Sequence, residues 1–385
     1  METSCPRPPS VAEKPATLFV ALELSKSTWL VAIHSPAADK ISQHRLAGGD
    51  ATALLSLIER KRGEAQAALL RPVCVMSCYE AGYDGFWLHR LLGDHGIDNR
   101  VLDAASILVD RRFRRGKTDR LDVAALLRTL MALARGEPRV CREVRAPSVE
   151  QEDERRRSRE RARLVNERGQ HLNRIKGLLM TQGVRDFAPT RRDWRKRLDG
   201  LRTADGRDLP LHLRQEIERE CRRLWLTVEM IAEVEAEQQQ AAKAAETAAT
   251  ESRAVAQLSR LRGVGPTTAN VLADEVFFRD FKNRRELAGY FGLVSSPWSS
   301  GAVNRDQGLA GSGNPRARRT ALELAWLWLR HQPDSALARW FHERVGAGKG
   351  RVRKTMIVAM ARKLMIALWK FLTLGVIPEG AVVKS

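Results

Sequence analysis

The chain has 385 residues, of which 43% are hydrophobic and 29% charged, so its composition indicates a globular protein with at least one sizeable core. It carries 66 Lys and Arg against 46 Asp and Glu, and this net charge of +20 favours a polyanionic partner, most often nucleic acid. The polar, Pro-rich N-terminus argues against a secretory signal. Three cations interrupt the most apolar late segment, which argues against a membrane span or a membrane partner. The five cysteines form no CxxC pair, which leaves a disulfide scaffold or a structural zinc site without support.

The first region, residues 17–147, alternates strand-like and helix-like patterns after a tail, residues 1–16, that we expect to be disordered. Apolar runs predict strands at 17–23, 28–34 and 72–78, alternation predicts one at 40–46, and another short strand is expected at 98–102. Helical patterns cover 51–60, 84–92 and a long segment from Thr118. Three strands followed by alternating helices and strands is the order of an RNase H-like α/β fold. A doubly wound nucleotide-binding sheet is the alternative, but no glycine-rich fingerprint follows the first strand.

The rest of the chain reads as predominantly helical. Residues 148–254 are highly charged, with an apolar seam at Leu164, Ile175, Leu178 and Leu179, which favours a long exposed helix or an antiparallel coiled coil as a linker. In residues 255–385, a glycine-containing turn at 262–266 indicates a helix-hairpin-helix-like segment. Residues 292–315 are rich in Ser, Gly, Asn and Pro and predict a long loop.

Four acidic residues are candidate metal ligands. Glu23 ends the first strand, Glu80 follows a later strand, and Asp119 and Asp122 share one helix face because they are three residues apart. Carboxylates suit Mg²⁺, and two such ions about 4 Å apart can stabilise the attacking and leaving oxygens of phosphoryl transfer. The alternative is that they are ordinary surface acids, and helix capping explains Asp119 equally well.

Basic and glycine-rich segments are candidate nucleic-acid contacts. The cluster before Asp119 would neutralise a phosphate beside a metal site, although such a run is usually a solvated face. It consists of Arg111, Arg112, Arg114, Arg115 and Lys117. Gly263 and Gly265 would let backbone N–H groups approach a phosphate, although a tight turn between helices explains them nearly as well.

A serine in the expected loop is a candidate nucleophile. Ser300, in the sequence Trp298-Ser-Ser-Gly301, could present its hydroxyl to phosphorus if a base or metal activated it. No histidine lies beside it, so a Ser-His-Asp hydrolase is not indicated. A polar loop serine without a chemical role is the alternative.

Taken in order, these motifs resemble the DEDD-type transposases of the IS one-ten insertion-sequence family, relatives of the Piv invertases. The resemblance spans about residues 18–372 and rests on seven short motifs: Leu22-Glu-Leu-Ser-Lys26, Tyr79-Glu-Ala81, Lys117-Thr-Asp-Arg-Leu-Asp122, Gly263-Val-Gly-Pro-Thr-Thr-Ala269, Tyr290-Phe-Gly-Leu293, Ser300-Gly301, and Gly313-Asn314 with Arg316 and Arg318. It implies an N-terminal RuvC-like domain, a helical coiled-coil linker and a mostly α C-terminal transposase domain.

The resemblance also assigns roles to residues. The family's four catalytic, metal-binding acids fall on Glu23, Glu80, Asp119 and Asp122, and its nucleophilic serine falls on Ser300. The first acid is usually Asp, so Glu23 departs from the pattern. Ser299 is adjacent, and only the glycine that follows Ser300 favours the latter. Arg316 and Arg318 are expected among the nucleic-acid-binding residues.

The function implied is a bacterial, cytoplasmic, nucleoid-associated recombinase. It would use Mg²⁺, expected as two ions, and a covalent serine–DNA intermediate, with a structured non-coding guide RNA pairing with donor and target DNA. The expected assembly is a homodimer or homotetramer. Two alternatives stay open: a two-metal nuclease of the Holliday-junction resolvase type, which needs no serine, and an inactive nucleic-acid-binding relative, which the glutamate at position 23 keeps in view.

Overall fold

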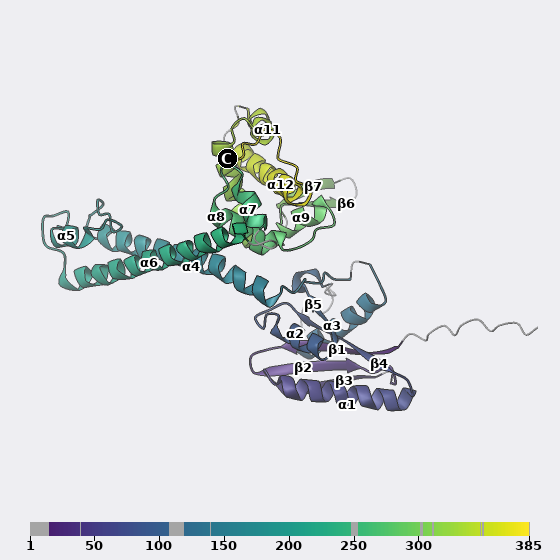
Figure 1. Ribbon diagram of the computed structural model, residues 1–385. Coiled ribbons are helices and arrows are strands. Elements are labelled where there is room, and N and C mark those ends of the chain that lie inside the picture. Colours follow the sequence, from purple (N-terminus) through teal and green to yellow (C-terminus); the bar gives the residue numbers. More distant parts are fainter. Residues whose placement is uncertain are drawn as a thin grey trace, which may run out of the picture. The chain divides into compact units, whose positions relative to one another are not determined.

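The computed structural model describes residues 15–38, 40–107, 119–138, 140–247, 253–300, 303–309, 312–346, 348 and 350–384. The chain divides into two compact units, Met1–Pro147 and Ser148–Ser385, and each is considered by itself (Figure 1). The expected basic cluster lies outside the described residues, and so do the side chains of Asp119 and Ser300. No helix in the described ranges is both long enough and apolar enough to cross a bilayer.

The first unit is built on a mixed five-stranded sheet with strand order β3-β2-β1-β4-β5 (Figure 1). β2 pairs antiparallel with β1 and with β3, whereas β4 runs parallel to β1 and to β5. The strands are β1 Ala16–Leu24, β2 Thr28–His34, β3 Ile41–Ala47, β4 Val73–Glu80 and β5 Asp98–Leu102. Every strand expected from the sequence is present, and this mixed α/β architecture is compatible with an RNase H-like fold.

Helices cover both faces of this sheet. The even-numbered side chains of β1, such as Leu18 and Leu22, pack with α1 (Ala51–Leu69) and α2 (Trp87–Asp94). The odd-numbered Ala21 and the β4 residue Cys78 pack against α3 (Asp119–Ala134) on the other face. A short 3₁₀ turn, η1 (Ala104–Ser106), follows β5. Because successive strand side chains point to opposite faces, each acid on β1 or β4 is assigned to one face by its position.

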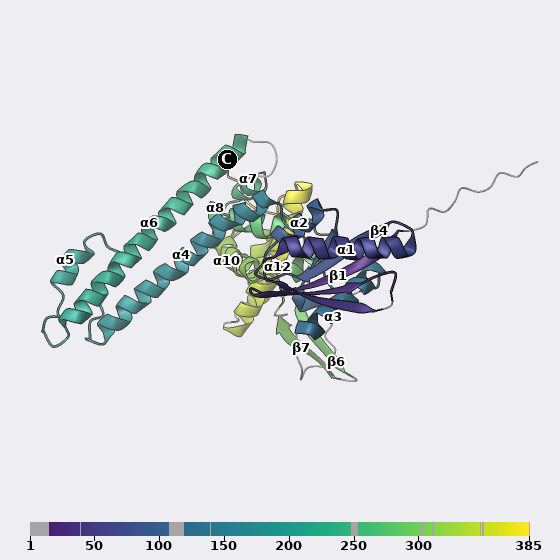
Figure 2. The same ribbon diagram turned by 90° about the horizontal axis from the view of Figure 1, so that it is seen from below.

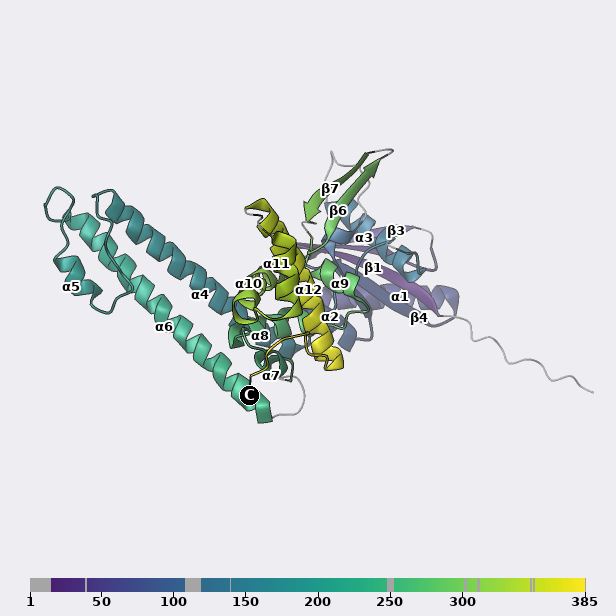
Figure 3. The same ribbon diagram turned by 90° about the horizontal axis from the view of Figure 1, so that it is seen from above.

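The second unit contains a long antiparallel helix pair, α4 (Val149–Met180) and α6 (Leu211–Thr247), which lie side by side in Figures 2 and 3. A capping box at Ser148 starts α4. The predicted seam is confirmed: Leu164 packs with Ile231 and Val234, and Ile175 packs with residues near the opposite end of the pair. A short helix, α5 (Trp194–Asp199), packs beside this end.

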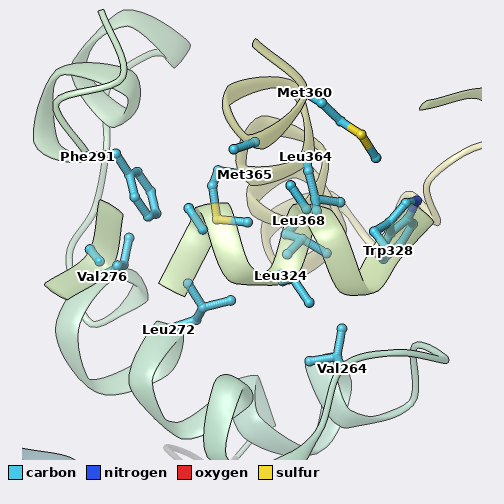
Figure 4. Close-up of a cluster of buried hydrophobic side chains, with 14 of the residues drawn as sticks. Val264, Leu272, Val276, Phe291, Leu324, Trp328, Met360, Leu364, Met365 and Leu368 are labelled. Carbon is cyan, nitrogen blue, oxygen red and sulfur yellow. The ribbon is translucent and has the colours of Figure 1, made fainter. Parts of the chain in front are cut away.

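The remaining elements form one helical core around α10 and α12 (Figure 4). Leu324 and Trp328 of α10 interdigitate with Leu364 and Leu368 of α12, and all four side chains are fully buried. The elements in order are α7 Arg253–Ser259, α8 Pro266–Leu272, the π-helix η3 Ala273–Phe277, α9 Arg284–Tyr290, β6 Ser295–Ser300, β7 Val303–Leu309, α10 Pro315–His331, α11 Ala336–Val345 and α12 Arg351–Leu374.

The expectation of a long serine loop at 292–315 was wrong. The segment instead contains an antiparallel hairpin, β6–β7, which projects from the helices of its unit (Figure 3). Its strands are mostly polar and lack the regular alternation of apolar and polar residues that indicates a half-buried strand. Pairing of the two backbones, which composition does not report, stabilises this segment.

Candidate active site

Two of the four predicted acids lie together in the first unit. β1 and β4 pair in parallel as far as Leu22 opposite Tyr79, and Glu23 and Glu80 are the next residue of each strand. Both acids are half-buried and line one pocket of about 540 Å³, formed by residues 22–26 and 80–84. Neighbouring parallel strands that end at the same edge of a sheet therefore bring together two carboxylates that are 57 positions apart in the sequence.

The other two acids belong to the helix that covers the same face. Glu23 is two residues after Ala21 in β1, and Glu80 is two residues after Cys78 in β4. Both acids therefore lie on the face of the sheet that packs against α3. Asp122 precedes the buried α3 residue Leu126 by four positions, so it continues the helix stripe that faces the sheet. Glu23, Glu80 and Asp122 therefore lie on one side of the sheet, and a place for the Asp119 carboxylate beside them stays a prediction.

The carboxylates that line the pocket are suitable ligands for a hard cation. Carboxylate oxygens are the ligands that Mg²⁺ prefers, and three carboxylates line the pocket: Glu23 and Glu80 at adjacent strand ends, and Asp84 in the turn after β4. Asp122 is half-buried and does not line this pocket. Within the described ranges, which exclude the Asp119 side chain, no three His, Cys, Asp or Glu residues are grouped closely enough to hold a metal ion. Metal binding by the four acids stays a prediction.

The β6–β7 register separates the two candidate serines. Trp298 pairs with Arg305, Ser299 with Asn304, and position 300 with position 303. Directly opposed residues share a face of the ribbon and neighbours alternate, so position 300 lies on the face of Trp298 and Arg305, whereas Ser299 lies on the other. The register thus separates the two positions, and the assignment of the nucleophile to Ser300 stays a prediction.

The glycine turn has a packing role in the described structure. Gly263 adopts a φ of +90°, and a Cβ there would lie 2.8 Å from the Cβ of His331 in α10. Only glycine tolerates both the left-handed backbone and this close approach. Gly265 is the N-cap of α8, followed by Pro266 at the first helical position. The turn joins two helices as expected, while its contact with nucleic acid stays a prediction.

The two arginines of the last motif are held by backbone carbonyls. Arg318 donates from Nε to the carbonyl of Phe291 at 3.0 Å and from Nη2 to that of Ser312 at 2.6 Å. Arg316 donates from Nη1 to the carbonyl of Ser158 in α4 at 3.0 Å. These contacts fix the start of α10 against α9 and α4, so both arginines have a structural role beside the nucleic-acid contact predicted for them.

A buried carboxylate that sequence reasoning missed organises this region. Glu275, in the π-helix, accepts two hydrogen bonds from Arg159 of α4, from Nε at 2.7 Å and from Nη2 at 3.1 Å. Its side chain is only 4% exposed, and Arg316 Nε lies 3.7 Å from the same carboxylate. Tyr290 donates its hydroxyl to the Glu275 carbonyl at 2.6 Å, and Asn314 Nδ2 lies 3.1 Å from that hydroxyl. The only sequence signal was an acidic pair inside an otherwise apolar stretch.

Charge explains why Glu275 stays ionised inside the protein. Burial raises the pKa of its carboxyl, but the hydrogen bonds and positive charge of Arg159, helped by Arg155 and Arg316, outweigh burial and lower the pKa below its usual range. Arg155 adds a hydrogen bond from Nε to the Asp274 carbonyl at 2.9 Å and stacks 4.0 Å above the Phe278 ring. The arginines of α4 thereby join the long helix pair to the C-terminal core.

The neighbouring Asp274 should make the free energy of unfolding depend on pH. Burial, with repulsion from Glu154, raises the pKa of its carboxyl to about 7. The folded chain therefore retains a proton that the unfolded chain releases, and the free energy of unfolding should fall as pH rises from about 4 to 7, by up to about 1.4 kcal/mol per pH unit. We expect Asp274→Asn to match the wild type near pH 4 and to be more stable at pH 8. Urea denaturation of both proteins at both pH values measures this. The prediction would be contradicted if the difference in free energy of unfolding between variant and wild type were the same at pH 4 and pH 8.

Comparison with known proteins shows the family to which this sequence belongs. The family model described as "Transposase IS116/IS110/IS902 family" matches residues 255–340, which include the π-helix, the hairpin and α10. "Putative transposase y4rJ" of Sinorhizobium fredii (strain NBRC 101917 / NGR234) is 48% identical over 375 residues, covering 96% of this chain and 95% of that protein. "Putative transposase y4qE" of the same strain is 30% identical over 263 residues, covering 67% of this chain and 60% of that protein. The chain belongs to the IS116/IS110/IS902 transposase family.

Proposed function

We propose that this transposase breaks and rejoins DNA at the ends of its insertion sequence through a covalent serine–DNA intermediate. Mg²⁺ serves as cofactor, a structured non-coding RNA pairs with donor and target DNA, and the protein works as a homodimer or homotetramer. DNA as the substrate follows from membership of the transposase family and agrees with the net charge of +20. The RNA and the serine step come from the motif resemblance and are tested below.

One observation carries the proposal: Glu23 and Glu80 stand side by side at the ends of adjacent parallel strands and line one pocket. Carboxylate oxygens gathered at one pocket are the ligands that a divalent cation such as Mg²⁺ prefers, and Asp84 adds a third carboxylate to the lining. Bound Mg²⁺ would neutralise the charge that develops on the phosphate oxygens during transfer. Glu23 and Glu80 would hold it, with Asp119 and Asp122 as the predicted ligands from α3.

The serine step is a transesterification. The Ser300 hydroxyl oxygen forms a bond to phosphorus, and the bond from that phosphorus to one deoxyribose oxygen breaks. The hydroxyl proton is lost from the serine, and the released sugar oxygen gains a proton. The free hydroxyl of another DNA strand then attacks the phosphoserine and regenerates Ser300, so strands are exchanged without net hydrolysis. The number of phosphodiester bonds is unchanged, and no external energy source is needed.

The test is to trap the intermediate in cells that carry the gene with its flanking non-coding DNA. Lysates are denatured and the protein is examined for covalently attached DNA. We expect an adduct with the wild type, none with Ser300→Ala, and nucleic-acid affinity equal in both. Ser299→Ala is the matched control and should retain the adduct, because the register places Ser299 on the opposite face of the ribbon.

Two outcomes would overturn the serine mechanism. An adduct that persists in Ser300→Ala and disappears in Ser299→Ala would assign the nucleophile to the other face of the hairpin. Metal-dependent nicking by the wild type without any adduct would favour a nuclease that uses the acids and no serine. Deleting the flanking non-coding DNA tests the RNA: recombination that continues undiminished would contradict an RNA guide.

A further inference from the structure

We propose that Tyr83 and Lys26 form a DNA-strand clamp at the mouth of the Glu23–Glu80 pocket, with Tyr83 stacking on an unpaired base and Lys26 binding an adjacent phosphate. This proposal rests on the proposed function in one respect: it requires that DNA binds over Glu23 and Glu80. Both residues line the same pocket as the two carboxylates. Tyr83 is fully exposed and Lys26 is exposed.

The turn that carries Tyr83 is fixed at both ends. Tyr79, which is fully buried, donates its hydroxyl to the carbonyl of Gly85 at 3.0 Å, and so anchors the far side of the turn to the core. The Ala81 N–H donates to the Leu102 carbonyl of β5 at 2.8 Å, and the Gly85 N–H donates to the Gly82 carbonyl at 3.3 Å. A short, anchored turn therefore holds an aromatic ring in water, where hydrophobic burial does not explain it.

The turn that carries Lys26 is fixed as well. Ser25 accepts a hydrogen bond from the Thr28 N–H at 3.1 Å and donates its hydroxyl to the Thr28 carbonyl at 2.6 Å. The Ser27 carbonyl accepts a hydrogen bond from the N–H of Gly48 at 3.0 Å. A Cβ at position 48 would collide with the Lys26 carbonyl, so that glycine is required for this close approach. The lysine is thus presented from a rigid backbone beside Glu23.

The combination fits a single DNA strand better than a protein or a small molecule. The pocket is lined by three carboxylates, Glu23, Glu80 and Asp84, which would repel an approaching phosphate, and the positive charge of Lys26 offsets part of that repulsion. An exposed aromatic ring stacks on any base, because every base has a π-face, and this contact is independent of sequence. A base can reach the ring only when it is unstacked from its neighbours, so the expected occupant is an unpaired segment of the strand being cut.

Photocrosslinking tests the position of the base. The full-length Ser300→Ala protein, which leaves the DNA intact, is irradiated with single-stranded DNA that contains 5-iodouracil, and crosslinked peptides are identified by mass spectrometry. We expect a crosslink on Tyr83, retained in Tyr83→Phe and lost in Tyr83→Ala. We also expect Tyr83→Ala to weaken binding of the same DNA about tenfold, as loss of one stacked base does, with Tyr83→Phe unchanged.

The lysine is tested by salt dependence. Lys26→Ala should reduce the slope of log affinity against log salt by about 0.7, the value for one contact with a single-strand phosphate. Lys40→Ala is the matched control, because Lys40 is an exposed lysine that precedes β3, at the end of the sheet away from the pocket, and its slope should equal that of the parent. Crosslinks only elsewhere, with Tyr83→Ala binding like the parent, would overturn the clamp. Because these binding and crosslinking measurements need no catalysis, their outcome is independent of whether a covalent protein–DNA adduct forms.

Discussion

Replacing Glu80 by Gln is expected to lower DNA strand cleavage and recombination at least about a thousandfold. The substitution keeps the volume of the side chain and removes the charge that would hold a cation against the reacting phosphate, and loss of one such electrostatic contribution typically costs two to three orders of magnitude. DNA affinity should change less than threefold, and in the direction of tighter binding, since a negative charge is removed. Product formation from a plasmid that carries the element and its flanks provides the measurement.

The matched control for this substitution is Glu64→Gln. Glu64 lies in α1 on the opposite face of the sheet, 53% exposed and paired with Lys61, so its loss should leave recombination unchanged. If Glu80→Gln recombined at the wild-type rate, the pocket would have no part in the chemistry and the reaction would have to be located elsewhere. An equal loss in both variants would indicate a general effect on the first unit.

Replacing Glu275 by Ala should strongly destabilise the second unit. The change removes the buried carboxylate from among Arg155, Arg159 and Arg316, and leaves guanidinium groups close together without their counter-charge. Removal of one partner of a buried ion pair costs about 3–5 kcal/mol. Because Arg159 is half-exposed, we expect a loss of stability near the lower end of this range. For a unit of this size, this corresponds to a fall in Tm of roughly 10 °C.

Tryptophan fluorescence of the full chain follows this transition, because only Trp29 and Trp87 of the nine tryptophans lie in the first unit. Glu323→Ala is the control, since Glu323 forms an exposed pair with Arg319 on α10 and should change stability by less than about 0.5 kcal/mol. A variant at position 275 as stable as the control would show that the network contributes nothing to the joining of α4 with the core.

Periodicity in the sequence was sufficient for the first unit and for the helix pair. Apolar runs located the buried strands β1, β2 and β4, and alternation of polar and apolar residues located the more exposed β3. The seam through Leu164 and Ile175 located the helix pairing, because apolar residues at helical spacing form the stripe along which two helices pack. The polar hairpin at Ser295–Leu309 escaped prediction, since backbone pairing between exposed strands leaves no hydrophobic pattern.

The sequence by itself determined the candidate residues: four acids, a serine and a set of ordered motifs. Tertiary structure decided which of them meet. Glu23 and Glu80 become neighbours only through parallel pairing of β1 with β4, a contact between distant segments that no local pattern encodes. The same holds for Glu275 and Arg159, which are 116 positions apart and are joined by the packing of α4 on the π-helix. Local propensity specifies elements, whereas burial and charge pairing between elements specify the site, because their free energies arise only when the chain is folded.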